Sequence, residues 1–252
     1  MQARIIPRLD IKGERLIKSV NLEGLRALGD PAVFAREYYQ QGACELLFVD
    51  AVASLYGRNG LGEIVGKLAK DIFIPLTVTG GIRSVDDVAA ALRNGADKVG
   101  VNTAAVRRPE LISEIARRFG SQCVVLSVEA KKRGPGSWEA YTDNGREPTG
   151  LDAVKWIQQA VEKGAGEILL TSVDKEGTRQ GYDEELLEAV SKSVMVPIIA
   201  SGGFSKPDDA LRVLRPGFAQ AVSMADYLHY KRGTISDIRS ALICDGFELR
   251  SL

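Results

Sequence analysis

The chain has 252 residues, of which 45% are hydrophobic and 26% are charged, with 33 basic residues against 33 acidic ones. A chain of this length and composition can bury a large core, and we expect a single domain over residues 1–252. The neutral charge balance excludes a global field that would attract nucleic acid or an anionic membrane, and no segment is long and apolar enough to span a bilayer.

Strands and helices are predicted to alternate along the sequence. Short segments rich in β-branched residues are followed by amphipathic segments, with Gly, Pro or Asp between them, which is typical of a parallel sheet. Eight strands are predicted, at residues 3–11, 45–52, 75–80, 98–102, 123–129, 167–173, 197–200 and 219–224. Because a helix follows each strand, we predict an α/β fold of the (β/α)8 TIM-barrel type. Residues 132–150 interrupt this alternation of strands and helices, and we expect a small hairpin there.

An internal repeat relates the two halves of the chain. Residues 75–82 match residues 197–204, and the same shift carries Gly42 to Gly164. Any two strand–helix units resemble each other to some degree, but that explanation is weak where several spaced positions align with one shift. We therefore predict a barrel built from two duplicated half-barrels.

The glycine pairs in this repeat lie where phosphate groups are commonly bound. In each half a strand ends in a Gly-Gly turn that leads into a helix, and the bare backbone amides of such a turn can hold a phosphate. The first phosphate cup consists of Thr79-Gly80-Gly81 with Asn102-Thr103, and the second of Ser201-Gly202-Gly203 with Ala225-Asp226. One Gly-Gly pair could be a plain tight turn, but two copies on opposite sides of a barrel mouth predict a long substrate phosphorylated at both ends.

Four carboxylates, Asp10, Asp50, Glu129 and Asp174, stand at strand ends, where such barrels carry their active sites. Asp10 ends the first strand and Glu129 the fifth, so a closed barrel sets them across the mouth from each other. One can donate a proton while the other accepts one, and neither needs a metal. The alternative is that they are solvated caps or structural ion-pair partners. Strand alternation puts Arg8 on the same face as Asp10, where it would keep the carboxylate ionised.

Four charged residues stand at the opposite, N-terminal ends of strands. They are Arg4, Glu45, Lys98 and Glu167, and we call them the charge ring. Two positive and two negative side chains can close into a neutral ring. On the residues alone, a salt-bridge plug that seals the barrel is the favoured interpretation.

The sequence gives no sign of a metal site or of disulfides. Cys44, Cys123 and Cys244 form an odd, dispersed set, and His229 is the sole histidine. Neither a disulfide framework nor a structural zinc site is supported, and a reducing cytoplasm fits best.

Several motifs together resemble the HisF family, the cyclase subunit of imidazole glycerol phosphate synthase, over essentially the whole chain. They include Leu9-Asp-Ile-Lys12 with Lys18, Gly80-Gly-Ile82, Asn102-Thr-Ala-Ala105, residues 164–172 and Ile198-Ile-Ala-Ser-Gly-Gly203. The resemblance implies a lyase of histidine biosynthesis that needs no cofactor. It also implies a glutamine amidotransferase partner, docked on the N-terminal face of the barrel, that supplies ammonia. In that family the matching ring guards the ammonia entrance, which favours a gate over a plug.

The family reaction joins ammonia to a doubly phosphorylated formimino ribonucleotide and yields imidazole glycerol phosphate and an aminoimidazole carboxamide ribotide. Asp10 matches a catalytic aspartate of the family, and Lys18 matches a loop residue that closes over the substrate. The candidate substrate-binding residues outside the two cups are Lys18, Asp50, Thr171, Asp174, Glu176 and Gly177.

Departures from the family pattern cluster around the expected substrate. Glu129 and Glu176 each replace an aspartate, and Arg8 stands where the family commonly has cysteine. Thr79 replaces a glycine, and Asp226 replaces a phosphate-side serine, where a carboxylate would repel a phosphate unless it turns away. Two alternatives therefore remain: a related barrel that uses channelled ammonia to form an acetamidino group on a surface-polysaccharide sugar, and a non-catalytic activator of a glutaminase.

Overall fold

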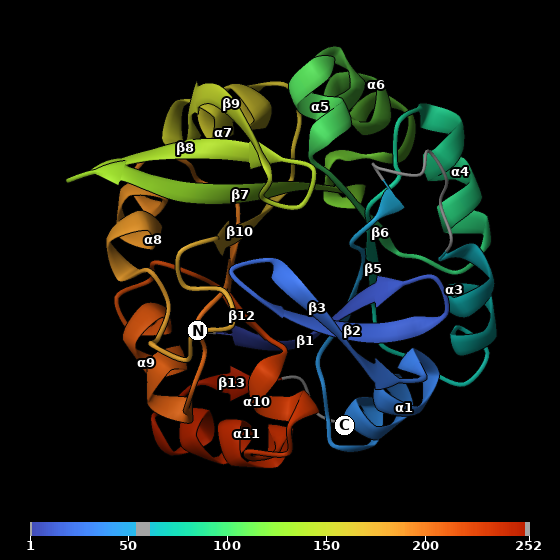
Figure 1. Ribbon diagram of the computed structural model, residues 1–252, viewed down its shortest axis with the longest axis vertical. Helices are drawn as coiled ribbons and strands as arrows, with labels where there is room; N and C mark the ends of the chain where they lie inside the picture. The colour runs from blue at the N-terminus through green and yellow to red at the C-terminus, as the bar shows by residue number, and fades with distance from the viewer. Residues whose placement is uncertain (1, 54–60, 250–252) are drawn as a thin grey trace.

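A computed structural model describes residues 2–53 and 61–249 of the chain. Within them, eight parallel strands close into a barrel surrounded by helices, which confirms the predicted (β/α)8 fold (Figure 1). The barrel strands are β1 (Gln2–Lys12), β4 (Leu46–Asp50), β5 (Leu76–Thr79), β6 (Lys98–Val101), β7 (Val124–Gly134), β10 (Glu167–Ser172), β11 (Ile198–Ser201) and β12 (Ala221–Met224). They pair in this order, and β12 returns to β1.

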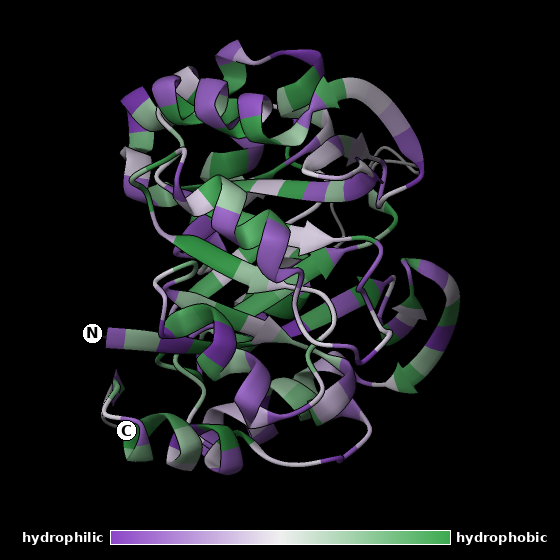
Figure 2. Ribbon diagram, turned by 90° about the vertical axis from the view of Figure 1, so that its left-hand side faces the viewer, coloured by the Kyte–Doolittle hydropathy of each residue, from purple (hydrophilic) through white to green (hydrophobic). Residues whose placement is uncertain are grey.

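The helices pack around the outside of the barrel. They are α1 (Pro31–Gln40), α3 (Gly62–Leu68), α4 (Val85–Arg93), α5 (Thr103–Arg107), α6 (Glu110–Phe119), α7 (Ala153–Glu162), α8 (Glu184–Ser191), α9 (Pro207–Leu214), α10 (Asp226–His229) and α11 (Ile235–Cys244), with a 3-10 turn at Ser121–Cys123 and a short strand β13 (Glu248–Leu249). Hydrophobic residues run along the central strands, and the helices alternate hydrophobic and hydrophilic residues, as expected when one helix face packs on the barrel (Figure 2). In the part of the chain that the structure describes, every helix is too short or too polar to cross a bilayer.

The two halves of the barrel repeat the same local geometry. Gly80 and Gly202 both have φ +95°, and a Cβ on either glycine would lie within 2.7 Å of a backbone oxygen, that of Asp50 or of Ser172. Asp87 at the start of α4 and Asp209 at the start of α9 both accept hydrogen bonds from the preceding backbone N–H groups. These shared details match the repeat seen in the sequence.

Substitution of Gly80 tests how tightly this turn is built. A Cβ at residue 80 would lie 2.5 Å from the Asp50 carbonyl oxygen on a left-handed backbone. We expect Gly80→Ala to lower the free energy of unfolding by about 3 kcal/mol, measured by urea denaturation. Gly217→Ala is the control, because φ is +80° there but a Cβ would meet no atom within 4 Å. That variant should lose only about 1 kcal/mol, and equal losses would contradict the steric argument.

The barrel interior is arranged in three layers. Because side chains alternate along β1, Arg4, Ile6, Arg8 and Asp10 share one face, and in the structure that face points into the barrel. The charge ring forms the layer at the N-terminal end. The middle is an apolar layer of Ile6, Leu47, Val49, Val125, Leu169, Ile199 and Ala221. Above it lie the polar side chains of the mouth, among them Arg8, Thr171 and Ser201.

Two hairpins extend over the mouth. The segment after β1, expected to be a loop, is instead a hairpin of β2 (Arg15–Val20) and β3 (Glu23–Gly29), which lies across the centre of the barrel in Figure 1. The hairpin expected at residues 132–150 is confirmed: the end of β7 pairs with β8 (Ser137–Thr142), which pairs with β9 (Glu147–Asp152). The two hairpins meet where Leu22 packs against Gly145.

Candidate active site

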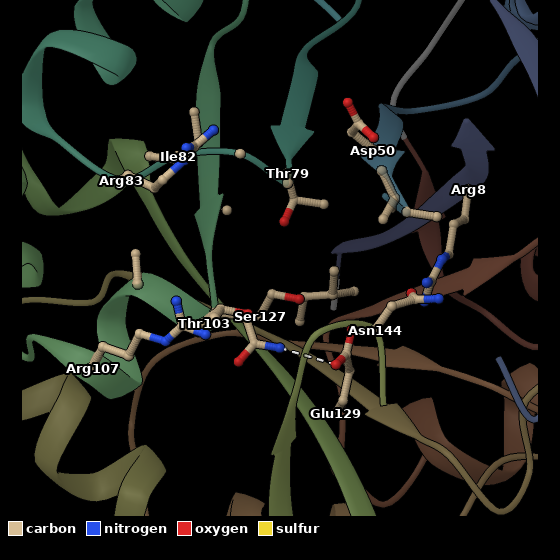
Figure 3. A pocket seen from close by; sticks show the side chains of 18 of the residues that line it. Arg8, Asp50, Thr79, Ile82, Arg83, Thr103, Arg107, Ser127, Glu129 and Asn144 are labelled. Atoms are coloured by element: carbon tan, nitrogen blue, oxygen red, sulfur yellow. Dashed lines mark hydrogen bonds between the residues drawn. The ribbon is translucent and has the colours of Figure 1, made fainter. Parts of the chain in front are cut away.

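The first phosphate cup opens into a cavity of about 310 Å³ at the mouth of the barrel. Gly80, Gly81, Asn102 and Thr103 line it, together with Asp50 and Glu129 (Figure 3). Positive φ angles of +95° and +76° at the two glycines turn the chain sharply after β5. The cavity therefore holds most of the residues predicted for this half of the site.

Three arginines at this cavity were missed by the sequence analysis. Arg83, Arg107 and Arg108 line the cavity beside the first cup, and Figure 3 shows Arg83 and Arg107 on the side opposite Arg8. Guanidinium groups match the oxygens of a phosphate well. Arg83 stands just after the Gly-Gly turn, and Arg107 and Arg108 stand at the end of α5. Both places border the cup, and this is the signal in the sequence that could have identified the three arginines.

The second phosphate cup is smaller, with a cavity of about 10 Å³ lined by Ser201, Gly202, Gly203, Asp226 and Gly177, among others. Asp226 does not present a bare carboxylate to this cup. Its Oδ1 accepts a hydrogen bond of 2.7 Å from Nε of Arg232, so its charge is paired. The repulsion expected between Asp226 and a phosphate is thereby reduced.

Asp10 is buried at the end of the inward face of β1. Its Oδ1 accepts a 2.8 Å hydrogen bond from Nε of Arg8, which confirms the predicted contact between these two residues. Its Oδ2 is buried and has no hydrogen-bond partner among the described residues. Asp10 lines neither cavity within the described residues, and its Oδ2 remains an unpaired acceptor beside Arg8.

Glu129 is buried beneath the β8–β9 turn. Its Oε2 accepts hydrogen bonds of 2.8 Å from the Gly145 N–H and 3.1 Å from Nδ2 of Asn102. Burial raises the pKa of Glu129 to about 7, and the Gly145 hydrogen bond and the positive charge of Arg8 oppose this rise only in part. At neutral pH Glu129 can thus hold a proton or release it, as an acid or base in catalysis must.

Lys18 and Glu176 form a buried ion pair where the β2–β3 hairpin meets the loop after β10. Nζ of Lys18 donates to Oε1 of Glu176 and, at 2.8 Å, to the Ser19 carbonyl. The backbone carbonyl of Glu176 in turn accepts a 2.7 Å hydrogen bond from the Asn21 N–H. Gly177 lies directly against Ser19 and Val20, where a Cβ would fall within 2.9 Å of backbone atoms. These contacts hold the hairpin against the barrel.

The remaining candidate residues differ in how close they lie to the two cavities. Asp50 lines the first cavity, and its Oδ1 accepts a 3.1 Å hydrogen bond from the Val52 N–H. Thr171 is buried, and its hydroxyl accepts a 3.1 Å hydrogen bond from Nη1 of Arg8. Asp174 is exposed and lines neither cavity within the described residues; its Oδ2 accepts from the Lys132 N–H at 2.8 Å. The structure thus brings Asp50 and Thr171 into the mouth and sets Asp174 beside the β7 extension.

The charge ring closes at the other end of the barrel. Nη1 of Arg4 and Nζ of Lys98 both donate to Oε2 of Glu45 at 3.0 Å, and both residues also pair with Glu167. Thr77 donates a further 2.6 Å hydrogen bond to Glu45. A hollow of about 300 Å³ lies over Arg4, Lys98 and Glu167 at this face.

Comparisons with known proteins identify relatives over most of the chain. Residues 4–234 match the family model described as histidine biosynthesis protein. The chain is 62% identical over 206 residues to the imidazole glycerol phosphate synthase subunit HisF of Legionella pneumophila, covering 82% of this chain and 97% of that protein. The subunits of the same name from Myxococcus xanthus and from Dehalococcoides mccartyi strain BAV1 are 49% and 46% identical, each over 99% of this chain and 98% of the relative.

Proposed function

The chain belongs to the HisF family of imidazole glycerol phosphate synthase subunits, and from this we propose how its barrel carries out the cyclase reaction of histidine biosynthesis. Ammonia adds to the ketone of a formimino ribonucleotide that has a phosphate at each end, and ring closure and cleavage release imidazole glycerol phosphate and an aminoimidazole carboxamide ribotide. The relatives cited above all bear the HisF name, so the polysaccharide and non-catalytic alternatives are not favoured.

One observation carries the proposed site: two glycine-turn cups flank a buried Asp10 and Glu129 at the same barrel mouth. The first cup, with its arginines, takes one phosphate of the substrate, and the second cup takes the other. The reacting ketone then lies between them. Asp10 accepts a proton from the attacking nitrogen and Glu129, with its pKa of about 7, exchanges a proton with the ketone oxygen.

The assay that tests this function uses the purified chain, the formimino ribonucleotide and an ammonium salt. Ring formation is followed by the loss of substrate absorbance. We expect turnover without any partner protein, and we expect the gene to restore growth of a strain that requires histidine. Failure of both would refute the proposed function.

We propose that the glutaminase partner docks on the N-terminal face, over the charge ring. Two apolar side chains stand out there: Phe73 and Met195 are 73% and 98% exposed, and each precedes a barrel strand by a few residues at matching positions of the two halves. Exposed apolar side chains and a charged hollow on the same face of a barrel are suited to an interface. The free thiols of Cys44, Cys123 and Cys244 fit the reducing cytoplasm in which we place the reaction.

Substitution of Lys98 tests whether the charge ring is a gate. Lys98→Ala removes one of the two cations that neutralise Glu45 and Glu167, so the ring loses its closed arrangement. We expect glutamine-driven activity of the complex to fall about tenfold or more, while ammonia-driven activity changes less than about twofold, because Lys98 is remote from the mouth. Lys155→Ala, at an exposed position on α7, is the control. Equal loss of both activities would make the ring a structural plug.

A further inference from the structure

Arg8 occupies the centre of the mouth, between the two phosphate cups. It lines the cavities of both cups, and no other residue of the described chain lines both. Its side chain is only 4% exposed, and it lies directly above the apolar layer. A ligand that reaches from one cup to the other must therefore pass the guanidinium group.

The hydrogen bonds of Arg8 leave part of the guanidinium group unused. Nε donates to Asp10 at 2.8 Å, and Nη1 donates to Thr171 at 3.1 Å and to Ser201 at 3.2 Å. Neither N–H of Nη2 has an acceptor within residues 2–53 and 61–249. Nη2 is not among the fully buried atoms that lack a partner, so its N–H groups border the cavities that Arg8 lines, where a ligand oxygen can accept from them. The unpaired donors at a shared wall of both cavities thus point to a ligand oxygen.

The charge of Arg8 is fixed. Burial alone would lower the pKa of Arg8. The nearby negative charges, of which Asp10 and Glu176 are the main ones, outweigh this effect, so the pKa lies above its ordinary value and the guanidinium group stays protonated. Arg8 cannot act as an acid or base, and its contribution must come from its charge and its hydrogen bonds. Glu129, which can carry a proton near neutral pH, lines the first cavity together with Arg8.

We propose that Arg8 positions Asp10 through Nε and, through Nη2, binds the oxygen of the substrate's reacting carbonyl between the two cups. The proposal rests on the function given above. Ammonia forms a bond to the carbonyl carbon with its lone pair, and the π electrons of the C=O bond move to the oxygen. Nη2 stabilises the negative charge that develops there. The oxygen then takes a proton from Glu129, and the nitrogen gives one to Asp10, which leaves a neutral carbinolamine.

A small side chain at position 8 would leave the mouth open. The proposed role explains why an arginine can occupy this position instead. Three fixed hydrogen bonds orient the planar group, so the free edge faces one direction before substrate arrives. Donors that are already oriented toward developing charge stabilise a transition state without reorganisation. Lysine has a single nitrogen and could not hold Asp10 and the substrate oxygen in the same way.

The experiment compares the wild type, Arg8→Lys, Arg8→Met and the surface control Arg36→Met with saturating ammonium chloride and the formimino ribonucleotide. Arg36 is an exposed residue that pairs with Asp71. We expect kcat to fall by about 10²–10³-fold in Arg8→Met and by about tenfold or more in Arg8→Lys. KM should change by less than about threefold, because the two phosphates remain bound. Arg36→Met should behave as the wild type.

A second readout separates positioning from folding. The carboxyl carbon of Glu129 is titrated by NMR in the absence of substrate. Because the charge of Arg8 opposes the rise in the pKa of Glu129, Arg8→Met should raise that pKa above its wild-type value, whereas Arg8→Lys should leave it nearly unchanged. If Arg8→Met does not fold, Arg8→Lys still decides the kinetic question, since it keeps the charge beside Asp10.

The outcomes distinguish this proposal from the function on which it rests. Absence of turnover in the wild type would refute the proposed function and this proposal together. Turnover in the wild type with an unchanged kcat in both Arg8 variants would overturn only the role of Arg8. An effect on KM alone would also overturn it, since the group would then bind substrate and transition state equally.

Discussion

Asp10→Asn is expected to lower kcat with ammonium salts by about 10³-fold or more, with little change in KM. The carboxylate has one oxygen fixed by Arg8 and one buried oxygen that has no hydrogen-bond partner among the described residues. An amide of the same shape must still accept from Nε of Arg8 with its oxygen. Its NH2 group then takes the place of the free acceptor, so the variant presents a donor where the reaction needs a base.

The control for this substitution is Asp71→Asn, which makes the same chemical change in an exposed ion pair with Arg36. Exposed pairs of this kind contribute about 0–1 kcal/mol, so neither stability nor turnover should change much. Circular dichroism and urea unfolding verify that Asp10→Asn is folded. If that folded variant kept more than about a tenth of the wild-type kcat, Asp10 would not be the base.

Glu129→Gln is expected to reduce kcat by about 10²–10⁴-fold and to change the pH dependence of stability. A glutamine oxygen can keep the hydrogen bonds from Gly145 and Asn102, so the fold should be retained. What is lost is the ability to exchange a proton. Turnover is measured with ammonium salts over a range of pH, with Glu188→Gln on the surface of α8 as control.

The sign of the stability effect follows from the direction of the pKa shift. The pKa of Glu129 is raised from 4.5 to about 7 in the folded protein, so the protonated form favours folding. Its contribution is fully present below pH 4.5 and is lost as the pH rises through about 7. The loss is on the order of 3 kcal/mol, since each pKa unit corresponds to about 1.4 kcal/mol.

Glu129→Gln should remove this loss, because glutamine has no charge to bury. Relative to the wild type, the variant should become more stable as the pH is raised from about 5 to 8, measured by urea unfolding at each pH. Glu188→Gln should follow the wild type throughout. A constant difference between wild type and Glu129→Gln across this range would show that the carboxyl group is not shifted.

The barrel and much of the site could be predicted from the sequence because they depend on local patterns. Strand alternation placed Arg8 beside Asp10, and the repeat located both glycine turns. The β2–β3 hairpin could not be predicted in this way. Its turn uses Asn21 and Leu22 with φ of 50° and 64°, and leucine is rarely found in that conformation. The burial of Leu22 against Gly145 of the other hairpin helps to compensate for the strain.

Other parts of the site depend on contacts between distant segments. The pairing of Lys18 with Glu176 joins residues 158 positions apart, and nothing near either residue indicates it. The cover over Glu129 likewise comes from the β8–β9 turn, whose Asp143, Asn144 and Gly145 all have positive φ. The Asp-Asn-Gly sequence predicts a turn, but only the fold shows that this turn covers Glu129 and donates a hydrogen bond to it from Gly145.

The apolar layer determines what can travel along the barrel axis in the proposed reaction. Its seven side chains offer no hydrogen-bonding group between the charge ring and Arg8. An ammonium ion would have to shed its water there and then approach a fixed positive charge, which is very unfavourable. Neutral ammonia carries no such cost. The barrel would therefore let neutral ammonia, which is the nucleophile, pass along its axis. An ammonium ion would have to lose its extra proton at the entrance before it could follow.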